Sequence, residues 1–269
     1  MKMDRFLSFG GVPVRFQVFR PLGDTKNRVA LIASPLLSIE QYDRIIPSLQ
    51  EKGNYCVVCD FPGFGPSSVR DRVSIEQAAN MLWGVLDEID KEEGGRLYCW
   101  HLVGHGLSCR AVYEMIRLSP GSVASMAMLC PVFTSGRALK SQGFMRFVLR
   151  AVSGRGSFAR AARFLYGKKL PEKEWMPLRR NFNRPGVREN IISILSQESD
   201  PQENALFAPQ MVIWCGRDAV LGGQISPDIK KRLPDGEYHT LPTAGHVPMY
   251  THAGAVRDYL RGWLGSNGS

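Results

Sequence analysis

The stretch Val103-Gly104-His105-Gly106-Leu107-Ser108 ends a run of apolar residues and begins a segment with helical periodicity. Residues 97–103 are typical of a buried strand, and residues 107–118 repeat their apolar positions at the spacing of a helix. Glycine adopts left-handed backbone angles that other residues avoid, so Gly106 allows a sharp turn. The sequence therefore predicts a strand, a tight turn and a helix in direct succession.

The same alternation of apolar strands and helices extends in both directions. We expect strands at residues 29–33, 55–59, 97–103, 123–129, 211–214 and 238–241, and helices at residues 39–52, 74–92, 107–118, 227–232 and 253–264. A hairpin is expected at residues 5–9 and 12–19, around Gly10-Gly11. Ser38 is expected to cap the helix at 39–52, with Gln41 at the reciprocal capping position. The fold class is therefore α/β, with a mostly parallel sheet covered by helices on both faces.

Several unusual loops leave the strands at one edge of this sheet. They follow residues 33, 59, 103 and 214, and a further loop holds Thr243-Ala244-Gly245-His246. Ligands of parallel sheets bind at the carboxyl ends of the strands. This edge is the expected place of a functional site.

The turn at Gly106 has the layout of a nucleophile elbow without its nucleophile. In a G-x-S-x-G elbow the serine would stand at position 106, in a strained conformation that costs a non-glycine residue about 1–3 kcal/mol. Either a natural loss of serine or a deliberate Ser-to-Gly replacement would leave the glycine seen here. Ser108 is a possible substitute nucleophile, as is Cys109, but Ser108 lies roughly 200° further round the helix.

Four segments, taken together, resemble the α/β-hydrolase superfamily over essentially the whole chain. They are CDFPGFGPS at 59–67, VGHGLS at 103–108, VIWCGRD at 212–218 and TAGHVPM at 243–249, in the order of the family. The resemblance implies a catalytic triad at Gly106 (the nucleophile position), Asp218 and His246. In such a triad the histidine takes a proton from the nucleophile and the carboxylate orients the imidazole ring.

The resemblance also implies an oxyanion hole beside the elbow. Many members have His-Gly where this chain has Ser34-Pro35, and proline has no N–H to donate. The backbone N–H groups of Leu36 and Leu107 are the expected donors, with the Ser34 hydroxyl as a further one. His105 is common at its position and is expected to be structural.

One basic segment interrupts the alternation of strands and helices. Residues 137–190 hold fourteen Lys or Arg against three acidic residues, whereas the rest of the chain has twenty and twenty-two. The resemblance implies a helical lid inserted after the sixth strand. We therefore expect a basic lid at 134–206 between two parts of the core, at 1–133 and 207–269. The lid's bases are either solvated or receive an anionic partner: a coenzyme A or carrier-protein thioester, or an anionic surface.

Other functional classes find little support in the sequence. No P-loop, nicotinamide fingerprint or metal-ligand spacing occurs, so we expect no cofactor and no metal, and no nucleic-acid-binding module is recognisable. The six cysteines lie mostly in or beside strand patterns, and Cys56-Val57-Val58-Cys59 has no second pair. Reduced core cysteines and the lack of a signal-peptide or transmembrane pattern predict a cytoplasmic protein.

The sequence thus predicts a serine hydrolase that acts on a small-molecule ester, a thioester or a related acyl bond, seen without its nucleophile. Two alternatives stay open. One is a natural pseudoenzyme that binds a ligand in a pocket enlarged by Gly106. The other is a lyase or cyclase in which His246 and Asp218 form a general base without covalent catalysis.

Overall fold

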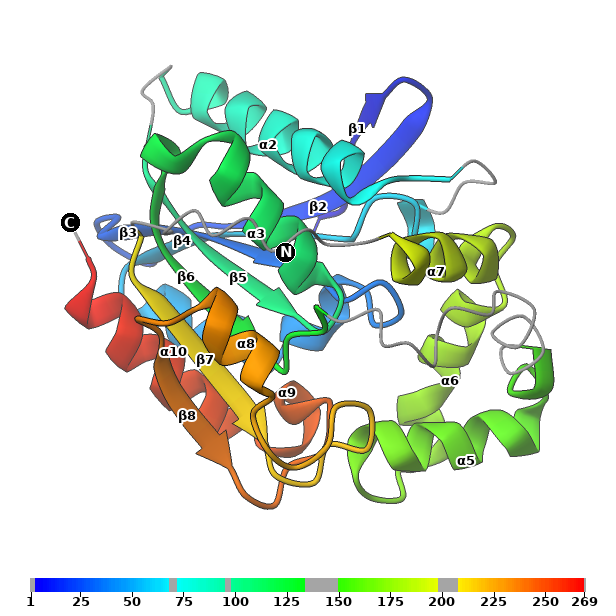
Figure 1. Cartoon of the computed structure of the whole chain (residues 1–269). Coiled ribbons are helices and arrows are strands. Elements are labelled where there is room, and N and C mark those ends of the chain that lie inside the picture. The colour runs from blue at the N-terminus through cyan, green and yellow to red at the C-terminus, as the bar shows by residue number, and fades with distance from the viewer. Residues whose placement is uncertain (1–2, 68–71, 95–97, 134–149, 198–207, 269) are drawn as a thin grey trace.

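The computed structural model describes residues 3–67, 72–94, 98–133, 150–197 and 208–268 (Figure 1). The strands are β1 (Arg5–Phe9), β2 (Val12–Phe19), β3 (Asn27–Ile32), β4 (Asn54–Cys59), β5 (Trp100–His105), β6 (Val123–Leu129), β7 (Gln210–Cys215) and β8 (Glu237–Leu241). The α-helices are α1 (Ile46–Glu51), α2 (Ile75–Glu92), α3 (Ser108–Leu118), α5 (Arg155–Tyr166), α6 (Glu172–Phe182), α7 (Val187–Ser196), α8 (Pro227–Arg232), α9 (Pro248–Thr251) and α10 (Ala253–Ser266). Short 3-10 helices are η1 (Ile39–Tyr42), η2 (Gly65–Ser67) and η3 (Pro120–Ser122).

The eight strands form one sheet in the order β1-β2-β4-β3-β5-β6-β7-β8. Strand β2 pairs antiparallel with both β1 and β4, and all strands from β4 to β8 along the sheet pair in parallel. Helices α2 and α3 pack on one face of the sheet, and α10 lies on the other with α1 packed against it (Figure 1). The mostly parallel sheet with helices on both faces confirms the predicted α/β fold class.

The central strands are buried because most of their residues are apolar on both sides. Every residue of β3, β4, β5 and β7 is buried, as parallel strands covered on both faces require. The hairpin, β6 and α8 lie at the expected residues, whereas β5 begins at Trp100, later than expected, and continues to His105. Its last residue therefore stands directly before Gly106.

The predicted helix at residues 39–52 is wrong. The structure has the short η1 and then α1, which begins at Ile46 with a proline in its first turn. Ser38 has a φ of 57° and makes no side-chain cap. The Asp60 carboxylate accepts the hydrogen bond from the Ile39 N–H instead, at 2.8 Å, while the Ser38 hydroxyl accepts one from the Asn181 amide. A carboxylate distant in sequence has taken the capping role expected of the serine.

The basic segment contributes α5, α6 and α7, which follow β6 and precede β7 in the chain (Figure 1). They extend beyond the carboxyl edge of the sheet. The domain boundary expected at 133/134 borders residues 134–149, and the one expected at 206/207 falls within residues 198–207. Both stretches lie outside the described residues. Among the described helices, none is long and apolar enough to cross a membrane.

Candidate active site

The elbow is a tight turn held by backbone hydrogen bonds. Gly106 has a φ of 59°, in the left-handed region. Its N–H donates to the Leu129 carbonyl at 2.9 Å, and its own carbonyl accepts from Val132 N–H at 3.0 Å. These bonds fix the turn to the end of the neighbouring strand β6. A side chain at residue 106 would therefore have a defined direction.

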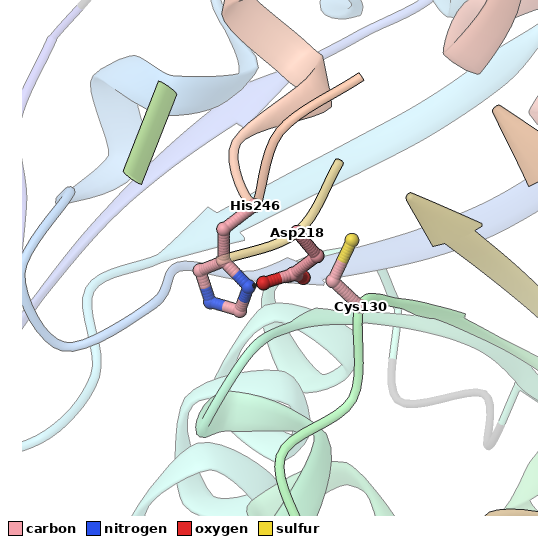
Figure 2. Close-up of side chains that lie close together, drawn as sticks. All are labelled: Cys130, Asp218 and His246. Atoms are coloured by element: carbon pink, nitrogen blue, oxygen red, sulfur yellow. Dashed lines mark hydrogen bonds and ion pairs between the residues drawn. The ribbon is translucent and has the colours of Figure 1, made fainter. Parts of the chain in front are cut away.

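Asp218 and His246 meet across two loops, as expected for an acid–base pair (Figure 2). Asp218 lies in the loop after β7, and His246 follows β8. The His246 Nδ1 and Asp218 Oδ2 atoms are 2.7 Å apart, and both residues are buried. The other carboxylate oxygen, Oδ1, accepts hydrogen bonds from the Val220 and Leu221 N–H groups at 2.8 and 3.0 Å.

These contacts keep the Asp218 carboxylate charged. Burial acts to raise its pKa, but the hydrogen bond and charge of His246, together with the two backbone N–H groups, lower it overall. A charged Asp218 accepts a hydrogen bond from the Nδ1–H group of His246 and so fixes the tautomer of the ring. Nε2 is then the nitrogen with a free lone pair, which is the form a general base needs.

The Nε2 atom of His246 lies beside the place where a side chain at residue 106 would begin. A Cβ built on Gly106 would lie 3.2 Å from His246 Nε2 and 3.3 Å from Ser34 Oγ. The loops after β3, β5 and β8 thus converge on one small volume. The structure brings Gly106, Asp218, His246 and Ser34 together as the sequence predicts.

His105 contacts the backbone of His246 and helps to hold it in place. Its Nε2 lies 2.7 Å from the carbonyl oxygen of His246, and the two rings are tilted at a centroid distance of 5.0 Å. Complete burial, with a smaller contribution from the His246 charge, lowers the pKa of His105 to about 3. A neutral His105 that donates to the His246 backbone positions the histidine loop.

Ser108 and Cys109 make other contacts. The Ser108 hydroxyl lies 2.9 Å from the Ile32 carbonyl and accepts a hydrogen bond from the His105 N–H at 2.8 Å, and the residue is completely buried. The Cys109 thiol contacts the Leu129 carbonyl, and burial raises its pKa. Ser108 therefore ties α3 to β3 and β5, and we find it in a structural role.

Two backbone amides are available as oxyanion donors. Leu36 and Leu107 are half-buried, and neither N–H has an acceptor within the described part of the chain. The Leu107 amide directly precedes the first turn of α3, where helix N–H groups are free. Both residues lie on the loops that carry Ser34 and Gly106.

Cys130 is a neighbour that the sequence analysis noted only as a core cysteine. Its Sγ, one Asp218 oxygen and one His246 nitrogen lie within 4.8 Å of one another (Figure 2). Cys130 directly follows β6, whose carboxyl end lies at the same edge of the sheet. Its place in the sequence could therefore have indicated that it lies near the site. Cys130 Sγ lies 3.0 Å from Cys215 Sγ, and both Asp218 oxygens already accept hydrogen bonds. These existing partners fit a His–Asp pair better than a metal centre.

All six cysteines are free, and five of them are buried. Cys99 is exposed, an exception to the expected core role.

A separate cavity of about 520 Å³ lies between the core and helix α6. Its basic lining residues are Arg15, Lys173, Arg180 and Arg184, and its acidic ones are Glu40 and Glu174. Arg15 is buried and already paired with Glu40 and Asp60. The cavity wall also includes Tyr166 and Tyr250, whose rings meet edge to face at 5.4 Å.

Many solved structures share this fold. A probable hydrolytic enzyme from Pseudomonas aeruginosa PAO1 is 17% identical, with a TM-score of 0.78, 97% of this chain covered and 93% of that chain. A membrane phospholipase A is 18% identical, with a TM-score of 0.79 and coverage of 99% and 86%. The Rv0554 protein from Mycobacterium tuberculosis is 16% identical, with a TM-score of 0.77 and coverage of 99% of each chain. At these identities the likeness establishes the fold alone.

No curated protein matches this chain in sequence. The model of the alpha/beta hydrolase family matches residues 35–259, which include the elbow, the acid and the histidine. With the sheet order and the His246–Asp218 geometry described above, this match shows that the chain belongs to the α/β-hydrolase family.

Proposed function

We propose that the site formed by Gly106, Asp218 and His246 is that of a hydrolase for an ester, a thioester or a related acyl bond, seen here without its serine. The family match supports a hydrolase ancestry, and a structural neighbour is named as a phospholipase A. In the chain as it stands, the His246–Asp218 pair is a general base without a covalent nucleophile.

The observation that carries this proposal is the direction of His246. Its Nε2 lies 3.2 Å from the Cβ position of residue 106, so a serine there would place its hydroxyl within reach of the base. The N–H groups of Leu36 and Leu107 would then stabilise the oxyanion of a tetrahedral intermediate. This is the division of roles found in a serine hydrolase.

The test restores the missing hydroxyl. We expect Gly106→Ser to raise the hydrolysis of short p-nitrophenyl esters and acyl thioesters by roughly 10²- to 10⁴-fold, because it adds the covalent nucleophile that His246 can activate. Gly106→Ala is the matched control, because it adds the same Cβ without a nucleophile. His246→Ala in the Gly106→Ser protein should remove the gain. Equal turnover by the serine and alanine variants would contradict the proposal.

A second candidate function is ligand binding without turnover. Both distances from the Gly106 Cβ position, 3.2 and 3.3 Å, are tight, so His246 or Ser34 must shift by a few tenths of an ångström to admit a side chain. These tight distances favour a site in which glycine is the natural residue at position 106. The Ser34-Pro35 pair also departs from the family pattern. A bound acyl ligand released intact from the protein, with no gain on Gly106→Ser, would support this alternative.

We also propose that α5, α6 and α7 form a lid and that the lid receives an anionic part of the substrate. The lid contacts the histidine loop closely, since a Cβ on Gly245 would lie 2.5 Å from the Gly167 nitrogen. Lys173, Arg180 and Arg184 line the cavity beneath α6. The phosphates of a coenzyme A or carrier-protein thioester would match these charges. The free buried cysteines favour the cytoplasm as the proposed location.

A further inference from the structure

The glycine at residue 106 leaves a small volume between two polar side chains. The Ser34 hydroxyl stands on one side of it and His246 Nε2 on the other, at 3.3 and 3.2 Å from the Cβ position. We propose that Ser34 and His246 together hold the water molecule that attacks the acyl carbon in the native Gly106 protein. This inference rests on the proposed acyl-hydrolase function, and it names the nucleophile that replaces the missing serine.

The Ser34 side chain is free to bind such a water. Within the described residues its hydroxyl makes no hydrogen bond, whereas its backbone is held by the Leu37 N–H, which donates to the Ser34 carbonyl at 2.9 Å. The Ser34 N–H lies 3.4 Å from the Gln41 side-chain oxygen. A fixed backbone with an uncommitted hydroxyl positions a ligand at little entropic cost.

The geometry favours a water as the attacking group over Ser34 itself. No hydrogen bond joins Ser34 Oγ to His246 Nε2, although both border the same volume. The structure therefore has no hydrogen bond along which a proton would pass directly from that hydroxyl to the imidazole. A water that bridges the two groups would lie on the side of Gly106 to which a Cβ would point. The side chain of a serine at residue 106 would occupy this same side.

The hydrolytic step balances with water as the only co-reactant. His246 Nε2 takes one proton as the water oxygen forms a bond to the acyl carbon, and Asp218 stabilises the imidazolium that results. The tetrahedral intermediate then expels the alkoxide or thiolate, which receives the proton from Nε2. The products are a carboxylic acid and an alcohol or thiol, and Ser34 orients the water throughout.

The test compares Ser34→Ala in two backgrounds. In the native Gly106 protein, we expect the substitution to lower kcat for p-nitrophenyl acetate by about 10- to 100-fold, because it removes one of two groups that orient the nucleophile. In the Gly106→Ser protein, the serine replaces the water as the nucleophile. We therefore expect Ser34→Ala to lower kcat by less than about threefold in that protein. Ser34→Thr, which keeps a hydroxyl, should retain more activity than Ser34→Ala in the Gly106 protein. Circular dichroism of each variant checks its fold.

Mass spectrometry of the reacting proteins separates a bound water from a covalent serine. The native protein should carry no acyl group, whereas the Gly106→Ser protein should be acylated at residue 106. An acyl group on Ser34 would overturn the inference, because Ser34 would then be the nucleophile. A loss on Ser34→Ala that is equal in both backgrounds would also overturn it.

Different results would contradict the acyl-hydrolase proposal and the inference of a bound water. If Gly106→Ser hydrolyses esters while the native protein does not, the acyl-hydrolase proposal stands and the water inference falls. If neither protein hydrolyses any ester or thioester, and His246→Ala changes nothing, the acyl-hydrolase proposal itself falls and the inference falls with it.

Discussion

Gly106 has a φ of 59°, a conformation in which a serine is strained. A serine at this position would also press on His246 Nε2 and Ser34 Oγ, which lie 3.2 and 3.3 Å from the Cβ position. A serine at residue 106 would therefore supply the nucleophile and strain the backbone at the same position. Stability and activity should change in opposite directions at this residue.

We expect Gly106→Ser to lower the free energy of unfolding by about 1–3 kcal/mol, the usual magnitude for a non-glycine residue in a strained conformation. Urea denaturation followed by tryptophan fluorescence measures the change. Gly262→Ser in helix α10 is a control, since a Cβ there meets no neighbouring atom and its φ is not positive. An unchanged midpoint for Gly106→Ser would show that the elbow is not strained by a side chain.

The meeting of Gly106, Asp218 and His246 could be anticipated from the sequence, because each follows a strand whose carboxyl end lies at the same edge of the sheet. The position of Cys130 beside Asp218 was missed, although it follows β6 at that edge. Chain order places a residue at an edge but does not say which way its side chain turns. Cys130 has a φ of 45°, which an extended-strand reading does not foresee.

At the scale of elements, helix α2 shows how local sequence alone can fix a boundary. The Ser74 hydroxyl accepts from the Gln77 N–H at 3.0 Å, and the Gln77 side chain accepts from the Ser74 N–H at 2.9 Å. Both hydrogen bonds join residues that are only three positions apart in the sequence. The start of this helix could therefore be predicted.

Removing this cap should cost stability without touching the site. We expect Ser74→Ala to lower the free energy of unfolding by about 1 kcal/mol, because the Gln77 N–H loses its partner. Thermal or urea unfolding measures the loss, with Ser266→Ala at the exposed end of α10 as the control. A change no larger than that of the control would mean that α2 is held by its packing alone.

The segment at residues 39–52 shows the opposite case. Its capping pattern at Ser38 and Gln41 was present, yet the Asp60 carboxylate from the end of β4 caps Ile39 instead. Pro47 then separates η1 from α1, since it stands in the first turn of the second helix. A contact between residues distant in sequence decided this element, so the local pattern gave the wrong boundary.

Strand β5 carries a buried histidine that should make stability depend on pH. Burial lowers the pKa of His101 to about 4, against an unfolded value of roughly 6.5. The stability that comes from keeping His101 neutral is therefore fully present above pH 6.5 and is lost as the pH falls toward 4. If His101 Nδ1 accepts the hydrogen bond from the Ser125 hydroxyl, protonation of Nδ1 would also break that bond.

The measurement compares the native protein with His101→Asn between pH 4 and 7. The difference in unfolding free energy should shrink with falling pH by up to about 1.4 kcal/mol per unit. Burial raises the pKa of Asp60 to about 7, which gives the opposite slope, but this contribution is common to both proteins and cancels in the difference. A difference independent of pH would contradict the account of His101.

At the scale of the whole molecule, the basic charge is concentrated beside the proposed site. One segment, residues 137–190, carries the whole basic excess of the sequence, and the described part of the chain between β6 and β7 forms three helices. The strand order of the sheet was not predicted, since composition and periodicity do not specify which strands are neighbours. The cavity at α6 could not be predicted from the sequence, because it depends on how α5 packs against α9 and α6 against η2.

The lid charges should affect binding more than chemistry. We expect the double variant Arg180→Gln/Arg184→Gln to raise KM for an acyl coenzyme A thioester by about tenfold at low salt, with a smaller effect at high salt and little change in kcat. The uncharged p-nitrophenyl ester serves as the comparison substrate. Arg160→Gln/Arg163→Gln is the matched control, as these exposed residues lie outside the cavity lining. Equal effects of the two double variants would argue against a specific anion site.

The most direct test of the central claim asks whether His246 can activate a hydroxyl at residue 106. The Gly106→Ser protein is treated with a fluorophosphonate, which loses fluoride when an activated serine attacks phosphorus, and the modified residue is located by mass spectrometry. The His246–Asp218 geometry predicts a phosphonyl group on residue 106 that disappears in the Gly106→Ser/His246→Ala protein. An unmodified Gly106→Ser protein, correctly folded, would contradict the account.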